Sequence, residues 1–324
     1  MTKKQRITSV LQGKPVDRIP ASFSLHFPES CFFGKSAIEA HRKFYLETDV
    51  DLLKIMNENK FSTDTVINTA DDWNHVRPIS GNEPYVQDQL NIIKAMADEF
   101  GDEVHIFATI HGIFASAFHA TNDKPENLAR HDKVSAHLKE RPEVVGPALK
   151  RIAEGLALLT RLCIEAGSAG IYYAALGAEK YRFSREVFNA HIKPNDLLIL
   201  EAASEAPAGT ILHMCKDQLN IDVYKDYPGD AVNWAEHELN IDLDTGRKLF
   251  NRPILGGFDD RSGVLVEGAK EELEKETRRL VKTFGPTGFM IGADCTLPTE
   301  IPYSRVRWVT DTLKETELMP VEFF

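Results

Sequence analysis

Three residues with soft donor atoms lie at the ends of two apolar stretches. His213 and Cys215 form an H-x-C pair at the end of Thr210–Cys215, and Cys295 follows the apolar run Phe289–Ala293. Side chains alternate along a strand, so His213 and Cys215 project from the same face. In a parallel barrel the carboxyl ends of separate strands meet at one mouth. One imidazole and two thiolates are typical of a Zn²⁺ site with one position left open.

Such a donor set suits sulfur chemistry. Zinc holds thiolates at neutral pH and lowers the pKa of an incoming thiol. Thiolate ligands keep the metal a weak Lewis acid, which favours activation of a sulfur nucleophile over formation of hydroxide. A lone H-x-C is a weak motif, because a Cys at a strand end is often a small buried apolar residue. The other two cysteines, Cys31 and Cys163, stand beside apolar residues and are predicted to have packing roles.

Alternating strand-like and helix-like stretches must position these residues. Helical spacing of apolar residues marks 143–166, 185–206 and 270–284 among others. Eight runs have the length and composition of strands: Ile19–Phe27, Asp51–Met56, His105–Ile110, Gly170–Leu176, Thr210–Cys215, Ala231–Ala235, Pro253–Phe258 and Phe289–Ala293. Repeated strand–helix order predicts an α/β fold with a parallel sheet. Eight units favour a TIM (β/α)₈ barrel, here with an N-terminal helical extension, over the alternative of an open doubly wound sheet.

Length and composition limit the class of protein. The 324 residues are predicted to form a single domain, 1–324, and 43% of them are hydrophobic, enough for a sizeable core. A net charge of −11 argues against a nucleic-acid partner. The chain lacks a long apolar run and a signal-peptide pattern, so we expect a cytoplasmic protein without a membrane segment. Residues 57–85 are polar and are predicted to form a long loop, a lid or partner surface.

Several segments of the chain have distinctive motifs. The opening Lys4–Ile7, followed by Leu11–Pro20 (LQGKPVDRIP), resembles the first segment of proteins of the uroporphyrinogen decarboxylase superfamily. Glu165–Tyr173 (EAGSAGIYY) resembles a mid-barrel strand, and Pro253–Asp259 (PILGGFD) resembles a later strand. The similarity extends over essentially the whole chain, and it implies a TIM barrel.

Two departures from that family pattern argue against porphyrinogen decarboxylation. The decarboxylases carry an Arg-rich R-Q-A-G-R-Y stretch that binds substrate carboxylates, whereas Phe23–Glu29 of this chain contains no Arg. They also carry a His in a G-H-G-I context, whereas this chain has Gly292–Thr296 (GADCT) there. A substrate with many carboxylates would therefore lack its guanidinium partners. A metal-free, uroporphyrinogen decarboxylase-like lyase acting on a tetrapyrrole remains the alternative function.

The soft donors resemble those of the zinc-dependent, corrinoid-linked methyltransferase branch. In that branch an H-x-C is followed roughly 75–80 residues later by a Cys, and His213, Cys215 and Cys295 match this pattern as zinc ligands. The resemblance implies an enzyme that moves a methyl group between a corrinoid (cobalamin), held on a partner protein, and a thiol or similar acceptor. Related enzymes add a Glu, so Glu236 is predicted to be catalytic as an exchangeable fourth ligand. His237 competes for that role, or is a surface residue that begins a helix.

Other residues at strand ends are candidate substrate contacts. Asn57 either faces the mouth or caps a helix, and His111 either lines the pocket or is a core residue. One of Tyr172 and Tyr173 must face inward, and Tyr172 is the candidate for packing against a flat corrin. Asp259 either orients substrate or caps the following segment.

The acceptor is left open by the sequence. Cys295 is followed by Thr296-Leu297-Pro298 rather than by the Gly-rich context of the thiol enzymes. Tetrahydrofolate, coenzyme M, homocysteine and a methoxylated aromatic all remain candidates, in either direction of transfer. A non-catalytic corrinoid-binding or chaperone protein is a third hypothesis.

Overall fold

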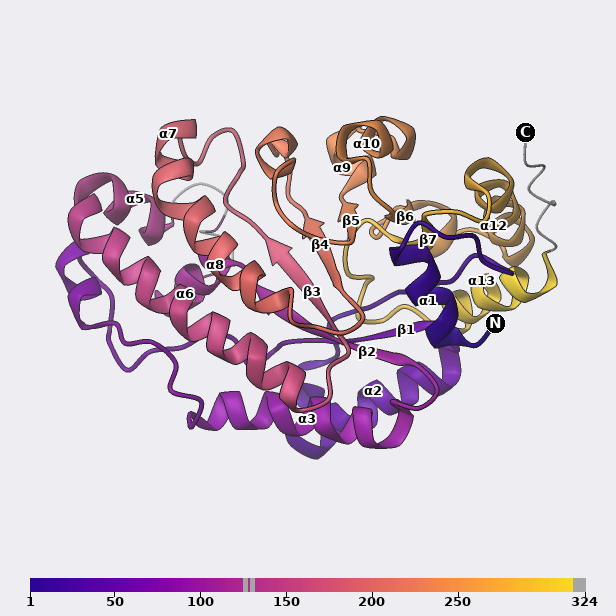
Figure 1. Cartoon of the computed structure of the whole chain (residues 1–324), viewed down its shortest axis with the longest axis horizontal. Helices are drawn as coiled ribbons and strands as arrows, with labels where there is room; N and C mark the ends of the chain where they lie inside the picture. Colours follow the sequence, from indigo (N-terminus) through magenta and orange to yellow (C-terminus); the bar gives the residue numbers. More distant parts are fainter. Residues whose placement is uncertain (125–127, 129–131, 317–324) are drawn as a thin grey trace.

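Seven parallel strands form one curled sheet in sequence order, surrounded by helices (Figure 1). The structure is a computed structural model that describes residues 1–124, 128 and 132–316. The strands are β1 (Leu52–Ile55), β2 (His105–His111), β3 (Gly170–Ala175), β4 (Thr210–Met214), β5 (Ala231–Trp234), β6 (Ile254–Phe258) and β7 (Phe289–Ala293). Each lies within one residue of a predicted run at both ends, so the predicted α/β barrel class is confirmed.

The predicted first strand, Ile19–Phe27, is not a regular strand, and this corrects the count of eight. It forms isolated parallel bridges only, from Ala21 to Ile291 and from Leu25 to Leu297. The backbone N–H of Asp51 also donates to the carbonyl of Ala21 at 2.9 Å, so the segment lies between β7 and the start of β1. A continuous ladder fails because Pro20 has no N–H and the N–H of Ala21 donates to the Asp51 side chain.

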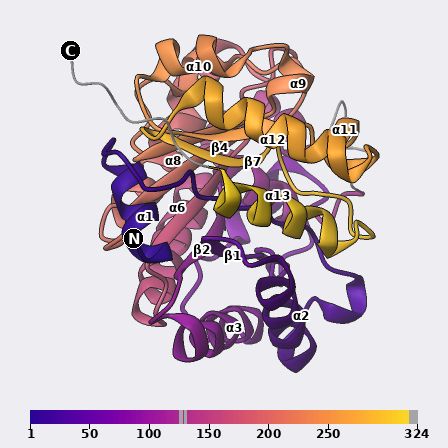
Figure 2. The ribbon, with the colours of Figure 1, turned by 90° about the vertical axis from the view of Figure 1, so that its right-hand side faces the viewer.

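The helices cover the outside of the sheet, and α12 and α13 lie side by side (Figure 2). They are α1 (Lys3–Leu11), α2 (Gly34–Thr48), α3 (Pro84–Phe100), α4 (Ile113–Ala120), α5 (Lys133–Glu140), α6 (Pro142–Glu165), α7 (Arg185–Val187), α8 (Lys193–Ala203), α9 (Glu236–Leu239), α10 (Leu243–Phe250), α11 (Gly263–Val266), α12 (Lys270–Phe284) and α13 (Tyr303–Glu315). No helix among the described residues is long and apolar enough to cross a membrane.

Two predicted stretches show local irregularity. The predicted helix 185–206 is divided by a π-helical turn, Phe188–Ile192, before α8. Pro194 has no N–H for the normal bond to residue 190, which explains why the helix changes its pitch there. The predicted loop 57–85 is irregular up to the start of α3, apart from the 3₁₀ helix Ala70–His75.

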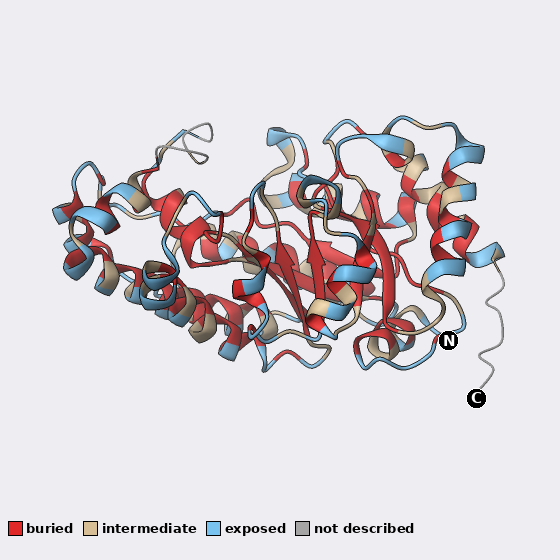
Figure 3. Ribbon diagram, turned by 90° about the horizontal axis from the view of Figure 1, so that it is seen from above, coloured by how far each residue is buried: buried red, intermediate tan, exposed pale blue. Residues whose placement is uncertain are grey.

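The interior of the sheet is apolar at its amino end. Buried side chains from the inner face of the strands pack against Ile7, Val10 and Leu11 of α1, which closes this end. Figure 3 shows the strands as the buried centre of the molecule. The strand residues of this layer are Leu52, Phe107, Tyr172, Ile211, Ala231, Leu255 and Met290.

On four of the seven strands, the next inward-facing position is polar. Side chains of the same face recur every second residue, so Leu52, Phe107, Ile211 and Ala231 are followed on the inner face by Lys54, Thr109, His213 and Asn233, all buried. The apolar layer thus forms a floor, and a polar layer lies on it toward the carboxyl ends of the strands.

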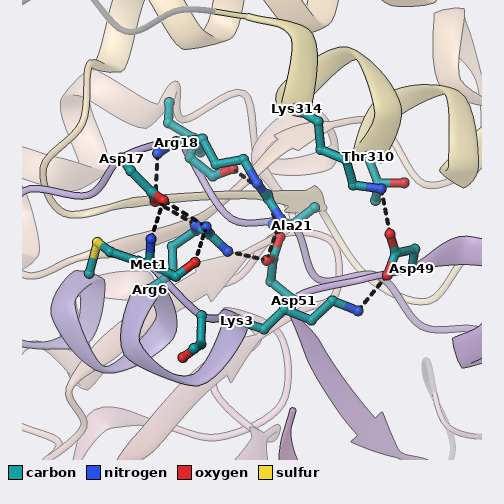
Figure 4. A network of polar contacts seen from close by, with 12 residues as sticks. Met1, Lys3, Arg6, Asp17, Arg18, Ala21, Asp49, Asp51, Thr310 and Lys314 are labelled. Carbon is teal, nitrogen blue, oxygen red and sulfur yellow. Dashed lines mark hydrogen bonds and ion pairs between the residues drawn. The ribbon is translucent and has the colours of Figure 1, made fainter. Parts of the chain in front are cut away.

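A dense charge network lies at the amino end of the barrel (Figure 4). The fully buried carboxylate of Asp51 accepts hydrogen bonds from Arg6 at 3.0 Å and from both terminal nitrogens of Arg18 at 2.7 and 2.8 Å. Asp17 accepts from Arg6 at 2.8 Å, and Lys3 pairs with Asp49. These contacts tie α1 and the extended segment to the start of β1.

Candidate active site

The three predicted metal ligands converge at the carboxyl end of the barrel. His213 is on β4, Cys215 directly follows β4, and Cys295 follows β7. Their donor atoms all lie within 4.8 Å of one another, and Cys295 Sγ is 3.5 Å from His213 Nε2. His213 is buried, and both cysteines are partly exposed toward the mouth. Two strands that lie far apart in the sequence therefore bring one imidazole and two sulfurs together.

Asn233 on β5 fixes the ring of His213. Its amide nitrogen donates to the backbone carbonyls of Leu255 at 2.8 Å and Ala293 at 3.1 Å. The amide oxygen must then be the acceptor for His213 Nδ1 and for the hydroxyl of Tyr172, the latter at 2.7 Å. Nδ1 consequently carries the proton, and the lone pair of Nε2 is directed toward the cysteines, as a metal ligand requires.

The closeness of the two cysteines separates their acidities. The neighbouring thiol of Cys215 holds the pKa of Cys295 well below its usual value, although burial opposes this. The neighbouring Cys295, together with burial, raises the pKa of Cys215. Binding of a divalent cation between the two sulfurs would displace the remaining proton.

The donor set fits zinc. Two sulfurs and one imidazole nitrogen with a free lone pair are the ligands that Zn²⁺ prefers, and three protein ligands leave a position for a substrate. The other cysteines lie elsewhere: Cys163 is buried in α6, and Cys31 lies in a 3₁₀ turn, Glu29–Cys31, before α2. Neither belongs to the soft cluster.

A cavity of about 320 Å³ opens directly beside the two sulfurs. Its lining is polar, and four of its nine residues are acidic: Cys215, Lys216, His237, Glu238, Asp259, Asp260, Arg261, Asp294 and Cys295. A second cavity of about 360 Å³ lies at the opposite end of the barrel, between α1 and the end of α8, and contains none of the soft donors. The first of these cavities is therefore the space in which a substrate could reach the sulfurs.

Comparison with known proteins identifies the family of this chain. The family model described as uroporphyrinogen decarboxylase (URO-D) matches residues 53–316. The chain belongs to this family. The resemblance inferred from the four sequence segments is therefore confirmed.

Two relatives in this family have names that specify a reaction. The chain is 22% identical over 216 residues to the "Methylcobamide:CoM methyltransferase MtbA" of Methanosarcina acetivorans, an alignment that covers 67% of this chain and 60% of the relative. It is 21% identical over 192 residues to MtbA of Methanosarcina mazei, covering 59% of this chain and 53% of the relative. The chain thus spans less than two thirds of the length of the curated relatives it matches.

Solved structures share the fold. A "methyltransferase from Methanosarcina mazei" has a TM-score of 0.73 at 15% identity and covers 97% of this chain and 99% of its own. A B12-independent methionine synthase from Shewanella sp. W3-18-1, in complex with selenomethionine, has a TM-score of 0.59 at 10% identity and covers 92% and 97%. The URO-D barrel of this chain is thus matched over nearly its full length.

Glu236 lies in a second cluster next to the soft donors. Its carboxylate is grouped with His237 and Asp294, with donor atoms within 4.8 Å of one another, and not with the two sulfurs. Burial raises the pKa of Glu236 to about 7, and Glu236 Oε2 is buried with no hydrogen-bond partner among the described residues. The hydrogen bond to Asp294 raises the pKa of His237 to about 9. Of the two glutamates in this segment, Glu238 lines the cavity with both sulfurs and Glu236 does not.

The predicted substrate contacts have different surroundings. Asn57 is buried and donates to the carbonyl of Thr109 at 3.2 Å, and its Oδ1 has no partner within the described residues. It caps no helix, since the next helical turn begins at Ala70. The ring of His111, at the end of β2, lies 5.1 Å from the ring of His119, and burial lowers its pKa well below the usual value.

Tyr172 and Asp259 make contacts that sequence reasoning left open. Tyr172 is the inward-facing member of its pair, but its hydroxyl is engaged with Asn233, while Tyr173 bonds Asp196 on the outer face. Asp259 lines the cavity and also accepts from the backbone N–H of Arg261 at 2.7 Å, which caps the turn.

Three functional candidates escaped sequence reasoning: Lys54, Asn233 and Glu238. The inward alternation of β1 and β5 was a signal for Lys54 and Asn233, because both fall on the same face as neighbouring apolar barrel residues. Glu238 stands two residues after Glu236 in the same short segment, and nothing in the sequence distinguishes the two carboxylates.

Proposed function

We propose that this URO-D family member is a zinc-dependent methyltransferase that moves a methyl group between a corrinoid, carried by a partner protein, and a thiol. The convergence of His213 Nε2 with the sulfurs of Cys215 and Cys295 beside an open cavity carries this proposal. The two MtbA relatives support it, since their name describes methyl transfer between a methylcobamide and CoM. We place the reaction in the cytoplasm, where thiols stay reduced.

Each protein ligand has a defined task in this proposal. Zinc, when bound, would hold a substrate sulfur as a thiolate at neutral pH. Asn233 holds His213 in the tautomer that presents Nε2, and Cys215, whose pKa is raised in the metal-free chain, would lose its proton on binding the ion. In the direction of thiol methylation, the bond between methyl carbon and cobalt breaks, its electron pair stays with cobalt, and the sulfur forms the new bond to carbon. The thiol proton passes to the carboxylate that the substrate displaces, and from there to solvent.

The fourth ligand position belongs to a carboxylate that the substrate displaces. The predicted residue, Glu236, keeps this role as a proposal, and its raised pKa suits a group that accepts the proton of an incoming thiol. Glu238 is the competing candidate, because it lines the cavity together with both sulfurs. Asn57, His111 and Asp259 remain proposed substrate contacts, and the ring of Tyr172 is proposed to face the substrate while its hydroxyl supports Asn233.

Metal analysis tests the site. The purified chain should contain about one zinc per chain, and Cys295→Ala should lose it, whereas Cys163→Ala, which lacks a cysteine of α6 far from the cluster, should retain it. Anaerobic demethylation of methylcobalamin in the presence of thiols should occur with the wild type and be abolished in Cys295→Ala. Zinc content that is unchanged in Cys295→Ala would reject the site.

The decarboxylase alternative predicts activity without zinc. Among the residues that line the cavity beside the sulfurs, the one guanidinium is that of Arg261, and it pairs with Asp260 at 2.8 Å. Turnover of uroporphyrinogen by chelator-treated, zinc-free protein would establish that alternative and displace the methyltransferase proposal. A chain that binds cobalamin but transfers no methyl group to any thiol would be the corrinoid-binding protein of the third hypothesis.

A further inference from the structure

The turn after Cys215, residues 216–218, has a backbone conformation that its residue types disfavour. Lys216 and Gln218 have φ angles of +98° and +52°, in the left-handed region. The other non-glycine residues with positive φ in the described part of the chain are all Asp or Asn, the types that adopt this region most readily. Backbone strain of this kind persists only where surrounding contacts impose it. A neighbouring segment must therefore hold the turn.

The contacts come from the segment that follows the neighbouring strand. The turn follows β4, and residues 178–182, which we call the strap, come after β3, its partner in the sheet (Figure 1). The backbone N–H of Lys180 donates to the carbonyl of Gln218 at 3.0 Å, and the N–H of Asn220 donates to the carbonyl of Ala178 at 2.9 Å. These bonds flank an isolated antiparallel bridge. The turn is thus fixed by β4 at one end and by the strap at the other.

A buried ion cluster anchors the strap. The guanidinium of Arg182 donates twice to the carboxylate of Glu179, at 2.8 and 3.0 Å, and once to Asp132, at 2.5 Å. Each of the three side chains is at most 4% exposed. Asp132 also caps the start of α5, where it accepts from the N–H of Ser135 at 2.7 Å. A cavity of about 260 Å³ lies beside the strap, so the ion cluster, rather than close packing on that side, ties the strap to α5.

We propose that Arg182 is a positioning residue of the soft-donor site, because it anchors the strap and the strap holds the turn next to Cys215. The inference rests on the proposed methyltransferase function, in which Cys215 is a zinc ligand. Without the anchor, Lys216 relaxes to a negative φ, and the sulfur of Cys215 leaves its place within 4.8 Å of the donor atoms of His213 and Cys295. Zinc must then restore the strained turn when it binds, which lowers its apparent affinity.

Urea unfolding of the metal-free full chain tests the coupling between Arg182 and the turn. Glycine adopts a φ of +98° without strain, although it also makes the unfolded chain more flexible. Lys216→Gly should therefore raise the urea midpoint of the otherwise wild-type chain, in which the turn is held in its strained form. In an Arg182→Met background the strain is already released, so the same substitution should lower the midpoint. Equal shifts in the two backgrounds would overturn the inference.

Arg182→Lys provides a milder second background for both measurements. It keeps the positive charge, so the two buried carboxylates are not left without a cation, but an ammonium cannot reproduce the forked contacts of the guanidinium. Lys216→Gly should raise the midpoint of Arg182→Lys by less than it raises that of the wild type. The coupling therefore remains measurable in a folded chain if Arg182→Met does not fold.

Zinc affinity, measured by competition with a chelating dye, connects the strap to the metal. Arg182→Met should weaken zinc binding roughly tenfold, as expected from the cost of one left-handed non-glycine residue, and Arg182→Lys should weaken it less. Lys216→Gly should regain most of this loss in Arg182→Met, and in the wild type it should change the affinity by less than about threefold. Unchanged affinity in folded Arg182→Met, or a loss that Lys216→Gly does not reduce, would contradict the positioning role.

Arg252→Met is the matched control. Arg252 is a partly buried arginine at the amino end of β6, where it donates to the carbonyls of Lys225 and Tyr227, both at 2.8 Å. Its substitution should lower the urea midpoint, leave zinc affinity within about threefold of the wild type, and show no coupling to Lys216→Gly. A wild-type chain that binds no zinc would reject the proposed function, whereas the urea measurements on metal-free protein would still decide whether Arg182 holds the turn.

Discussion

The two ends of the barrel hold buried charges in opposite ways. At the amino end, the carboxylate of Asp51 accepts hydrogen bonds from three residues: the side chains of Arg6 and Arg18 and the backbone N–H of Ala21 (Figure 4). At the carboxyl end, polar atoms of Asn57, Glu58, His119 and Glu236 are buried without a hydrogen bond within the described part of the chain, whereas at the amino end the exception is a single ring nitrogen, His105 Nδ1. Complete pairing is what a stabilising network needs, and unpaired buried groups are retained where a ligand completes them. The paired charges of the amino end therefore stabilise the fold, and the unpaired groups of the mouth are available to a substrate.

Asp17 shows how thoroughly the amino end is paired. Burial alone would raise its pKa, but hydrogen bonds from Arg6 and from the N-terminal ammonium hold it well below the usual value. A carboxyl group with a depressed pKa contributes stability above its unfolded pKa, and this contribution is lost as the pH falls. Two carboxyl groups at the mouth have the reverse pattern, because burial raises the pKa values of Glu236 and Asp260. Ionisation of these two groups therefore destabilises the fold, whereas ionisation of Asp17 at the amino end stabilises it.

The largest expected effect is at the amino end. Asp51→Ala leaves two guanidinium groups without their shared buried carboxylate, and it should lower the free energy of unfolding by roughly 3–5 kcal/mol. Urea unfolding measures this loss. Glu205→Ala, which removes an exposed ion pair with Arg161, is the control and should cost less than about 1 kcal/mol. A loss for Asp51→Ala as small as that of the control would break the comparison of the two ends.

A smaller effect is expected at the mouth, on metal affinity rather than on folding. Asn233→Ala releases the ring of His213, and zinc affinity should fall roughly 10- to 100-fold, as for other residues that orient a metal ligand. Competition with a chelating dye measures the affinity.

Tyr172→Phe is the matched control for Asn233→Ala. It removes the other hydrogen bond to the same amide oxygen and leaves the bond to His213 in place. Its zinc affinity should stay within about threefold of the wild type. Equal losses in the two variants would show that Asn233 does not act through the tautomer of His213.

The smallest expected effect is a gain in the free energy of unfolding, produced by a substitution at Glu236. The pKa of Glu236 is raised to about 7 in the folded chain, so folding binds a proton there, and this contribution to stability is lost as the pH rises above about 5 toward 7. Glu236→Gln removes the cost of burying the charge. In zinc-free protein it should therefore raise the free energy of unfolding by roughly 1 kcal/mol at pH 8, and change it little at pH 5. Denaturation at both pH values provides the measurement, and destabilisation at pH 8 would contradict it.

Sequence reasoning reached the fold because its signals are local. Each of the seven strands is a short apolar run between amphipathic stretches, and a run of this length can be read without knowledge of its neighbours. The segment Ile19–Phe27 has the same apolar character but does not form a continuous ladder. Its failure depends on the side chain of Asp51, which reaches it only in the folded chain.

Part of the candidate site could also be predicted from local sequence signals, and part could not. Alternation along a strand placed His213 and Cys215 on one face, and the family pattern supplied Cys295. Sequence reasoning gave Glu236 the fourth position, but the turn of α9 groups its carboxylate with Asp294 and puts Glu238 beside the sulfurs. The direction of a side chain in a four-residue helix depends on what packs around it, which a single sequence does not reveal.

The amino-acid sequence by itself determined the order of strands and helices, the α/β barrel class and the three soft donors at strand ends. Only the tertiary structure decided that the donor atoms meet within 4.8 Å and that Asn233 fixes the tautomer of His213. The physical reason is that periodicity along the chain sets which way a side chain faces. Distance, burial and charge balance depend instead on residues that folding brings from other strands.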